Sequence, residues 1–196
     1  EMVEAILPFC ASARTSPHNF VFLEGVKAAL TADQNFRSGH YDSPPESGLK
    51  AFARVYAGWA FSQSFYREGL FRNLGFETPE DLLKDWEDDH LNWDANNLLA
   101  KLRTWQTADI SANPLYGGDF QLALSAIQAK TIVIASSSDL YFTPEDNKLE
   151  VRQMQNAELR IYDSPWGHCV ASTGNDPEFT RFLDSAISEL LETDIC

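Results

Sequence analysis

The sequence is poor in basic residues and has no long apolar run. Its 196 residues carry 15 Lys and Arg against 29 Asp and Glu, a formal net charge of −14, without a basic cluster that could follow a phosphate backbone. This balance argues against a nucleic-acid partner. No stretch approaches the roughly 18 apolar residues of a membrane span, and the first residues lack the features of a signal peptide. We therefore expect no membrane partner and a cytoplasmic location.

Cysteine is also scarce, and common cofactor motifs are absent. Cys10, Cys169 and Cys196 are too few and too far apart for a disulfide framework or a closely spaced zinc site, which favours a reducing compartment. No phosphate loop, dinucleotide fingerprint or calcium loop occurs. The sequence therefore predicts neither a cofactor nor a bound metal.

What remains is a globular composition, 44% hydrophobic and 12% aromatic, sufficient for one sizeable core. Residues 1–45 begin with an apolar strand, Ala5 to Cys10, and Ser16-Pro17 then opens a helix. Because a strand of the type that is buried in a sheet begins within a few residues of Glu1, we expect the sequence to start inside a larger fold. We expect these residues to belong to the core of a larger fold.

Residues 46–117 show a helical pattern throughout and are rich in aromatic residues. Phe52, Tyr56 and Trp59 fall on one helical face, while Thr78-Pro79 and Asp94 have the character of helix starts. This segment is predicted to be an all-helical insertion.

Residues 118–196 alternate between helix and strand. Helices are expected over 119–127, from Pro144 and from Pro177, the last with its apolar side chains, including Ile187, facing inward; strands are expected over 131–135 and 158–162. Continuous apolar strands that alternate with helices are typical of a parallel sheet covered on both faces. The fold class is therefore α/β.

An acid and a histidine follow these two strands. Asp139 comes shortly after the strand 131–135, and His168 follows the strand 158–162 in a Pro-Trp-Gly-His turn. Functional residues of such sheets lie beyond the carboxyl ends of strands, so we expect the two loops to be neighbours. Asp139 could then orient the imidazole of His168, as in a catalytic triad. A helix cap and an ordinary loop histidine are the alternatives.

No serine of the chain has the context of a nucleophile. The G-x-S-x-G pattern does not occur, and Ser12 is flanked by Cys10 and Arg14, whereas a nucleophile elbow needs small residues there. Cys169 adjoins His168, but neighbouring side chains of an extended loop usually diverge, so Cys169 is predicted to pack rather than to react.

Five segments give the chain a resemblance to a known family. They are Phe9 to Arg14, Trp59 to Arg67, Asp94 to Leu99, Ser138 to Asp146, and Ser164 to His168. With these segments the sequence resembles the homoserine O-acetyltransferase-like branch of the α/β-hydrolase superfamily, from its C-terminal part. The resemblance implies parallel strands flanked by helices, with residues 46–117 as a helical lid between core segments 1–45 and 118–196.

The resemblance also implies a Ser-His-Asp triad with Asp139 as acid and His168 as base. The nucleophilic serine would lie upstream, in an N-terminal half of the same enzyme, and the activity would be acyl transfer or ester hydrolysis. In homoserine acyltransferases an Asp commonly follows the histidine and helps hold the acceptor, whereas Cys169 stands here. An amino-acid O-acetyltransferase and a non-catalytic, truncated binding module remain alternatives.

Candidates for substrate contacts come from residues near the proposed pair and near the insertion. Phe142 and Trp166 are predicted to wall a pocket, although core packing is a common fate of such residues. Arg14, Tyr66 and Arg67 are further candidates, with surface ion pairs as the alternative for the two arginines. The expected substrate is a small acyl ester or an acyl-CoA, and a homodimer is compatible with the sequence.

Overall fold

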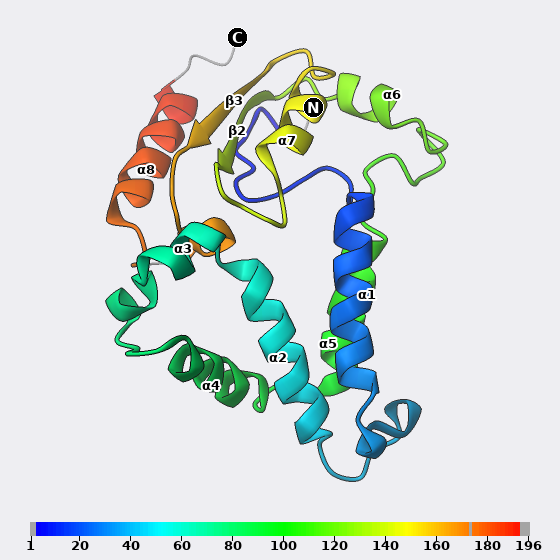
Figure 1. Cartoon of the computed structure of the whole chain (residues 1–196). Coiled ribbons are helices and arrows are strands. Elements are labelled where there is room, and N and C mark those ends of the chain that lie inside the picture. The colour runs from blue at the N-terminus through cyan, green and yellow to red at the C-terminus, as the bar shows by residue number, and fades with distance from the viewer. Residues whose placement is uncertain (1–2, 173, 193–196) are drawn as a thin grey trace. The chain divides into compact units, whose positions relative to one another are not determined.

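The computed structural model describes residues 3–172 and 174–192, so that Cys196 lies outside the described residues. The chain forms two compact units (Figure 1). The first combines Glu1–Arg14 with Asp109–Cys196, and the second is Thr15–Ala108.

The first unit is built on a parallel sheet. Its strands are β1 (Ala5–Ile6), β2 (Lys130–Ser136) and β3 (Ala157–Tyr162), in the order β1-β2-β3. Six residues of β2 pair with β3, and the register places Thr131 opposite Ala157. Because β2 and β3 run in parallel, their carboxyl ends meet at one edge of the sheet, as the sequence predicts.

The first strand is shorter than its apolar sequence predicts. Regular pairing ends at Ile6, and a single bridge joins Phe9 to Ile134 beyond it. Pro8 has no N–H to donate, although its carbonyl accepts a bond from the Ile134 N–H at 2.9 Å. Cys10 then turns the chain with φ at +46°, a value that non-glycine residues rarely adopt. The strand expected over residues 5–10 therefore ends at Ile6, and the prediction is wrong for residues 7–10.

Helices cover both faces of this sheet. They are α6 (Phe120–Ser125), α7 (Pro144–Val151) and α8 (Pro177–Glu192), with the short 3₁₀ helix η3 over Gly167–Ala171. α7 packs against β2 and β3, and α8 packs against β2 from the other side (Figure 1). On α8, Phe179, Ala186 and Leu190 are buried, whereas Ile187 is 40% exposed, so its expected inward orientation is wrong.

The second unit is helical. Its elements are α1 (Pro17–Thr31), η1 (Gln34–Gly39), α2 (Glu46–Ala60), α3 (Gln63–Glu68), η2 (Leu70–Leu74), α4 (Pro79–His90) and α5 (Ala95–Gln106). The predicted helix starts are present, since the side chains of Ser16, Thr78 and Asp94 each accept a bond from the backbone N–H three residues on. None of the helices in the described part of the chain has the length and apolar character needed to cross a membrane.

α1 belongs to the helical unit rather than to the sheet unit. Leu23, Val26 and Leu30 on α1 are fully buried, and α1 packs against α2 and α5. The compact unit therefore begins at Thr15 and ends at Ala108, while the sequence predicts a lid over 46–117. Contacts between helices set the limits of this unit, and these contacts cannot be read from the local pattern of each helix.

Candidate active site

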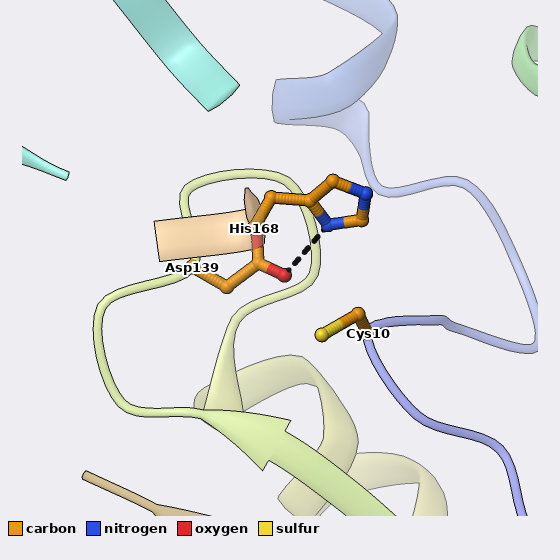
Figure 2. Close-up of side chains that lie close together, drawn as sticks. All are labelled: Cys10, Asp139 and His168. Carbon is orange, nitrogen blue, oxygen red and sulfur yellow. Dashed lines mark hydrogen bonds and ion pairs between the residues drawn. The ribbon is translucent and has the colours of Figure 1, made fainter. Parts of the chain in front are cut away.

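Asp139 and His168 lie together beyond the ends of β2 and β3. The acid loop, residues 137–143, follows β2. The histidine loop, residues 163–168, follows β3 and includes the first two residues of η3. His168 Nδ1 is 2.9 Å from Asp139 Oδ2 (Figure 2). The two residues that the sequence singles out from separate strands thus form a hydrogen-bonded pair.

Several donors hold the Asp139 carboxylate in place. Its side chain is fully buried, and Oδ1 accepts bonds from the backbone N–H groups of Tyr141 at 2.7 Å and Phe142 at 3.2 Å. Oδ2 is left to face His168. This arrangement fixes the orientation of the carboxylate and directs one oxygen at the ring.

The imidazole of His168 is partly exposed and flanked by aromatic rings. Its side chain is 31% exposed, and the ring centroids of Tyr141 and Phe142 lie 4.8 and 5.5 Å from its own. An Nδ1–H that donates to Asp139 leaves Nε2 as the basic nitrogen of the neutral ring. This tautomer can take a proton from a hydroxyl group and later return it.

A serine beside the acid joins the acid loop to the histidine loop. Ser138 Oγ donates to the carbonyl of Ser164 and accepts a bond from the N–H of Gly167 at 3.1 Å. Gly167 has φ at +65°, which favours glycine, and it directly precedes His168. Ser138 therefore fixes the backbone at Ser164 and Gly167, directly before His168.

A second serine strengthens the same connection. Ser137 Oγ donates to Asp163 at 2.6 Å and accepts a bond from the N–H of Ser164 at 3.2 Å. Sequence reasoning overlooks both serines as site residues. Their position directly before Asp139 is the signal that could have identified them.

The Cys10 thiol completes the surroundings of the pair. Cys10 is 6% exposed, and its Sγ, an Asp139 oxygen and a His168 ring nitrogen all lie within 4.8 Å of one another (Figure 2). Burial, followed by the charge of Asp139 and the proximity of Cys169, raises the pKa of Cys10 to about 12. Cys10 was not predicted as a site residue, because the turn that brings it here depends on a positive φ.

Neither nearby thiol has the character of a nucleophile. Burial and the charge of Asp139 raise the pKa of Cys169 to about 12 as well. Thiols with such pKa values are protonated at neutral pH, and the thiolate is the reactive form. This supports the expectation that Cys169 packs rather than reacts.

The two predicted pocket walls differ in their surroundings. Phe142 is half-buried, with its ring beside that of His168. Trp166 is buried, and its backbone N–H donates to Ser164 Oγ at 3.3 Å. Phe142 therefore lies beside the ring of His168, whereas Trp166 is buried within the sheet unit.

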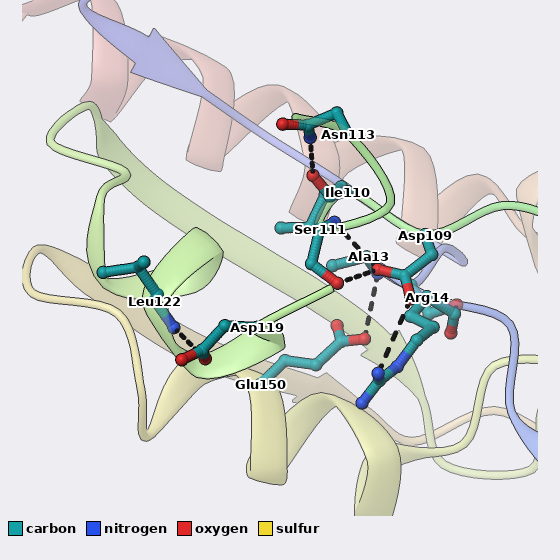
Figure 3. Close-up of polar contacts among 10 residues, drawn as sticks. Ala13, Arg14, Asp109, Ile110, Ser111, Asn113, Asp119, Leu122 and Glu150 are labelled. Carbon is teal, nitrogen blue, oxygen red and sulfur yellow. Dashed lines mark hydrogen bonds and ion pairs between the residues drawn. The ribbon is translucent and has the colours of Figure 1, made fainter. Parts of the chain in front are cut away.

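The other substrate candidates lie in different surroundings. Arg14 forms an ion pair with Asp109 at 3.5 Å (Figure 3). Its guanidinium carbon lies 3.8 Å from the centre of the Phe120 ring. In the helical unit, Tyr66 Oη donates to the carbonyl of Ala57 at 2.9 Å, and Arg67 is exposed at the end of α3. The alternative foreseen for Arg14, an ion pair, is thus present, and a substrate role for these three residues stays a prediction.

Comparison of the sequence with known proteins points to esterases and acyltransferases. No family model matches. The chain is 30% identical over 196 residues to a probable esterase of Corynebacterium glutamicum and 33% identical over 196 residues to an ethyl acetate hydrolase of Pseudomonas veronii. Each match covers 98% of this chain and 55% of the relative. Homoserine O-acetyltransferases are similar at a lower level, such as 26% over 174 residues for that of Chloroherpeton thalassium, covering 86% of this chain and 45% of the relative.

Solved structures agree with this picture. The acetyl esterase MekB has a TM-score of 0.92 at 33% identity, and an acetylester hydrolase from Corynebacterium glutamicum has a TM-score of 0.91 at 29% identity. Each match covers 97% of this chain and 55% of the solved chain. The chain thus spans about half the length of the proteins it matches. It has the α/β-hydrolase fold, of which it forms the C-terminal part.

Proposed function

We propose that the protein that carries this chain hydrolyses small acyl esters, with His168 as general acid and base and Asp139 as its orienting carboxylate. The observation that carries the proposal is the 2.9 Å contact between His168 Nδ1 and the buried Asp139. Similarity to an ethyl acetate hydrolase and to an acetyl esterase supports acetyl esters as the substrate class.

In this proposal, each nitrogen and oxygen atom of the pair has a defined task. His168 Nε2 takes the proton of a serine hydroxyl as its oxygen attacks the ester carbonyl, and Asp139 stabilises the imidazolium that forms. His168 then protonates the leaving alcohol, and water hydrolyses the acyl-enzyme by the same proton transfers. Backbone N–H groups outside this chain would hold the oxyanion.

The nucleophilic serine is proposed to lie outside these 196 residues. Ser12, the serine that follows the first apolar strand, donates its Oγ proton to the carbonyl of Arg14 at 3.0 Å. Among the described strands, β1 is hydrogen-bonded only to β2, and Val3 and Phe9 beside it are 52% and 38% exposed. A further strand from an N-terminal half could pair along this edge and cover these side chains.

A second candidate function is acyl transfer to an amino-acid hydroxyl. It is favoured by the similarity to homoserine O-acetyltransferases, and an acyl-CoA would then be the donor. Cys169 counts against homoserine as acceptor, because it replaces the Asp that this family commonly carries beside the histidine.

Product analysis separates the two candidates. The protein that carries this chain is incubated with ethyl acetate or acetyl-CoA, each with and without homoserine, and acetate and O-acetylhomoserine are quantified. We expect acetate from the ester in both mixtures and no transfer product. O-acetylhomoserine formed in preference to acetate would reverse this assignment, and the absence of both products would favour a binding role.

A further inference from the structure

Three side chains that could each offer a ligand atom to a metal ion lie close together at the proposed pair. Cys10 supplies a sulfur, Asp139 a carboxylate oxygen and His168 a ring nitrogen, all within 4.8 Å of one another (Figure 2). Cys10 lies in the turn after β1, Asp139 in the acid loop and His168 in η3, all of them in the sheet unit. Ester hydrolysis through a serine needs the acid and the histidine but gives the thiol no task.

This donor set matches the preferences of one class of metal ion. Zn²⁺ is bound by sulfur, imidazole nitrogen and carboxylate oxygen at about 2.0–2.3 Å, often with three protein ligands and one water. Mg²⁺ and Ca²⁺ prefer oxygen ligands and are disfavoured by the thiol and the imidazole.

The distances require only a small adjustment. Ligand atoms around a tetrahedral Zn²⁺ lie about 3.3–3.7 Å apart at these bond lengths. The Asp139–His168 contact of 2.9 Å must therefore open by a few tenths of an ångström, and Cys10 Sγ must approach by about 1 Å at most. The Cys10 backbone is anchored for this, since its N–H donates to the carbonyl of Ile134 at 3.1 Å.

We propose that Cys10, Asp139 and His168 form a binding site for Zn²⁺ that holds the enzyme in an inactive state. Zn²⁺ takes the place of the proton on His168 Nδ1, which passes through water to Nε2, and the Cys10 thiol releases its proton to water, so that one proton is released in all. The neutral imidazole then carries its one ring proton on Nε2, so that this nitrogen can no longer accept a proton from a serine. The inhibitory part of the inference rests on the proposed ester hydrolysis, whereas the binding part does not.

Cobalt serves as the spectroscopic probe of binding. Co²⁺ is added to the metal-free protein that carries this chain, and the near-ultraviolet charge-transfer band of a thiolate bound to Co²⁺ is recorded. We expect a band that saturates at one Co²⁺ per chain, is displaced by Zn²⁺ and disappears in Cys10→Ser. Cys169→Ser is the matched control, because it removes the neighbouring thiol and should keep the band.

Both variants retain Cys196, so a band from that thiol would persist in each. Thermal unfolding of the wild-type protein, Cys10→Ser and Cys169→Ser tests whether Cys10→Ser is folded. His168→Ala should weaken Co²⁺ binding at least tenfold. No band in the wild-type protein, a band that survives in Cys10→Ser, or a band lost only in Cys169→Ser would overturn the site.

Turnover of an acetyl ester tests the consequence for activity. Zn²⁺ should inhibit the wild-type protein, a chelator should restore its activity, and Cys10→Ser should raise the Zn²⁺ concentration for half-inhibition at least tenfold. Unaffected turnover in the presence of bound Zn²⁺ would contradict the inactive state. Co²⁺ binding by a protein without any metal-free turnover would leave the metal site standing and count against the proposed ester hydrolysis.

Discussion

Different kinds of interaction stabilise the interior of each of the two units. At the ends of β2 and β3, the hydrogen bonds of Ser137 and Ser138, and the bond that Asp139 accepts from His168, join the acid loop to the histidine loop. The helical unit relies on apolar packing, with stacked rings such as Phe61 on Phe65 at 4.1 Å and Phe52 on Tyr56 at 5.5 Å.

The helical unit also contains open space. Side chains of α2, α4 and α5 line a cavity of about 680 Å³, among them Phe52, Tyr56, Trp86 and Trp105. The sheet unit thus positions a few polar atoms through hydrogen bonds between loops, whereas the helical unit is stabilised by packed apolar and aromatic side chains. Changes in the first should therefore affect chemistry, and changes in the second should affect stability.

The largest expected effect is the loss of the acid–histidine pair. Asp139→Asn keeps the shape of the side chain but no longer holds His168 in the required tautomer, and we expect kcat to fall about 10³–10⁴-fold. Steady-state kinetics with an acetyl ester measure this. Thr180→Ala, on the exposed surface of α8, is a control that should leave kcat unchanged. A fall of less than tenfold in Asp139→Asn would remove Asp139 from the mechanism.

The second prediction concerns the packing of the helical unit. Leu82 of α4 is fully buried, so Leu82→Ala should lower the free energy of unfolding by about 2–5 kcal/mol. Val21→Ala, at a position 67% exposed on α1, should change it by less than about 0.5 kcal/mol. Urea unfolding of both variants measures the difference. Equal effects would show that α4 is not packed as described.

The third prediction concerns the connection between the acid and histidine loops. Ser138→Ala leaves the Gly167 N–H and the Ser164 carbonyl without their partner, and we expect kcat to fall about tenfold with a smaller change in KM. Ser125→Ala removes an exposed hydroxyl bonded within α6 and serves as the control. An unchanged kcat in Ser138→Ala would mean that the loops hold their positions without this serine.

Two buried ionisable groups, one in each unit, should give opposite dependences of stability on pH. Burial raises the pKa of Glu150 above its ordinary value of 4.5, so the folded state binds the proton more tightly than the unfolded chain. Stability should therefore fall as pH rises from 4.5 through the raised pKa. Glu150→Gln keeps an acceptor for the Ala13 N–H (Figure 3) and should remove this slope in urea unfolding across that range. A persistent slope would assign it to other groups.

His90 should show the reverse dependence in the helical unit. Burial lowers the pKa of His90 below 6.5, against the opposing effects of the Trp86 carbonyl and Asp89. The folded state then binds the proton less tightly than the unfolded chain, so stability should fall as pH drops from 6.5 through the lowered pKa. His90→Gln should reduce this loss, as followed by thermal unfolding at pH values on both sides of 6.5. An identical loss in the variant would contradict the assignment to His90.

The sequence predicts well what depends on local signals. The strands over Lys130–Ser136 and Ala157–Tyr162, and the helix starts at Ser16, Thr78 and Asp94, follow from apolar runs and cap residues. The proximity of Asp139 and His168 follows from the parallel order of two strands. These features need no knowledge of distant contacts.

Features that depend on tertiary contacts were missed or misjudged. The turn at Cys10 needs a positive φ that cysteine does not signal, and it cuts short the strand expected over 5–10. The bonds of Ser138 reach a loop 26 residues further along the chain. The assignment of α1 to the helical unit arises from its packing against α2 and α5.

The most direct test of the central claim is active-site labelling with a fluorophosphonate, followed by mass mapping of the labelled residue in the natural protein. We expect one label, on a serine outside these 196 residues, that is lost in His168→Ala. A label on a serine within these residues, or labelling that is unchanged in His168→Ala, would contradict it.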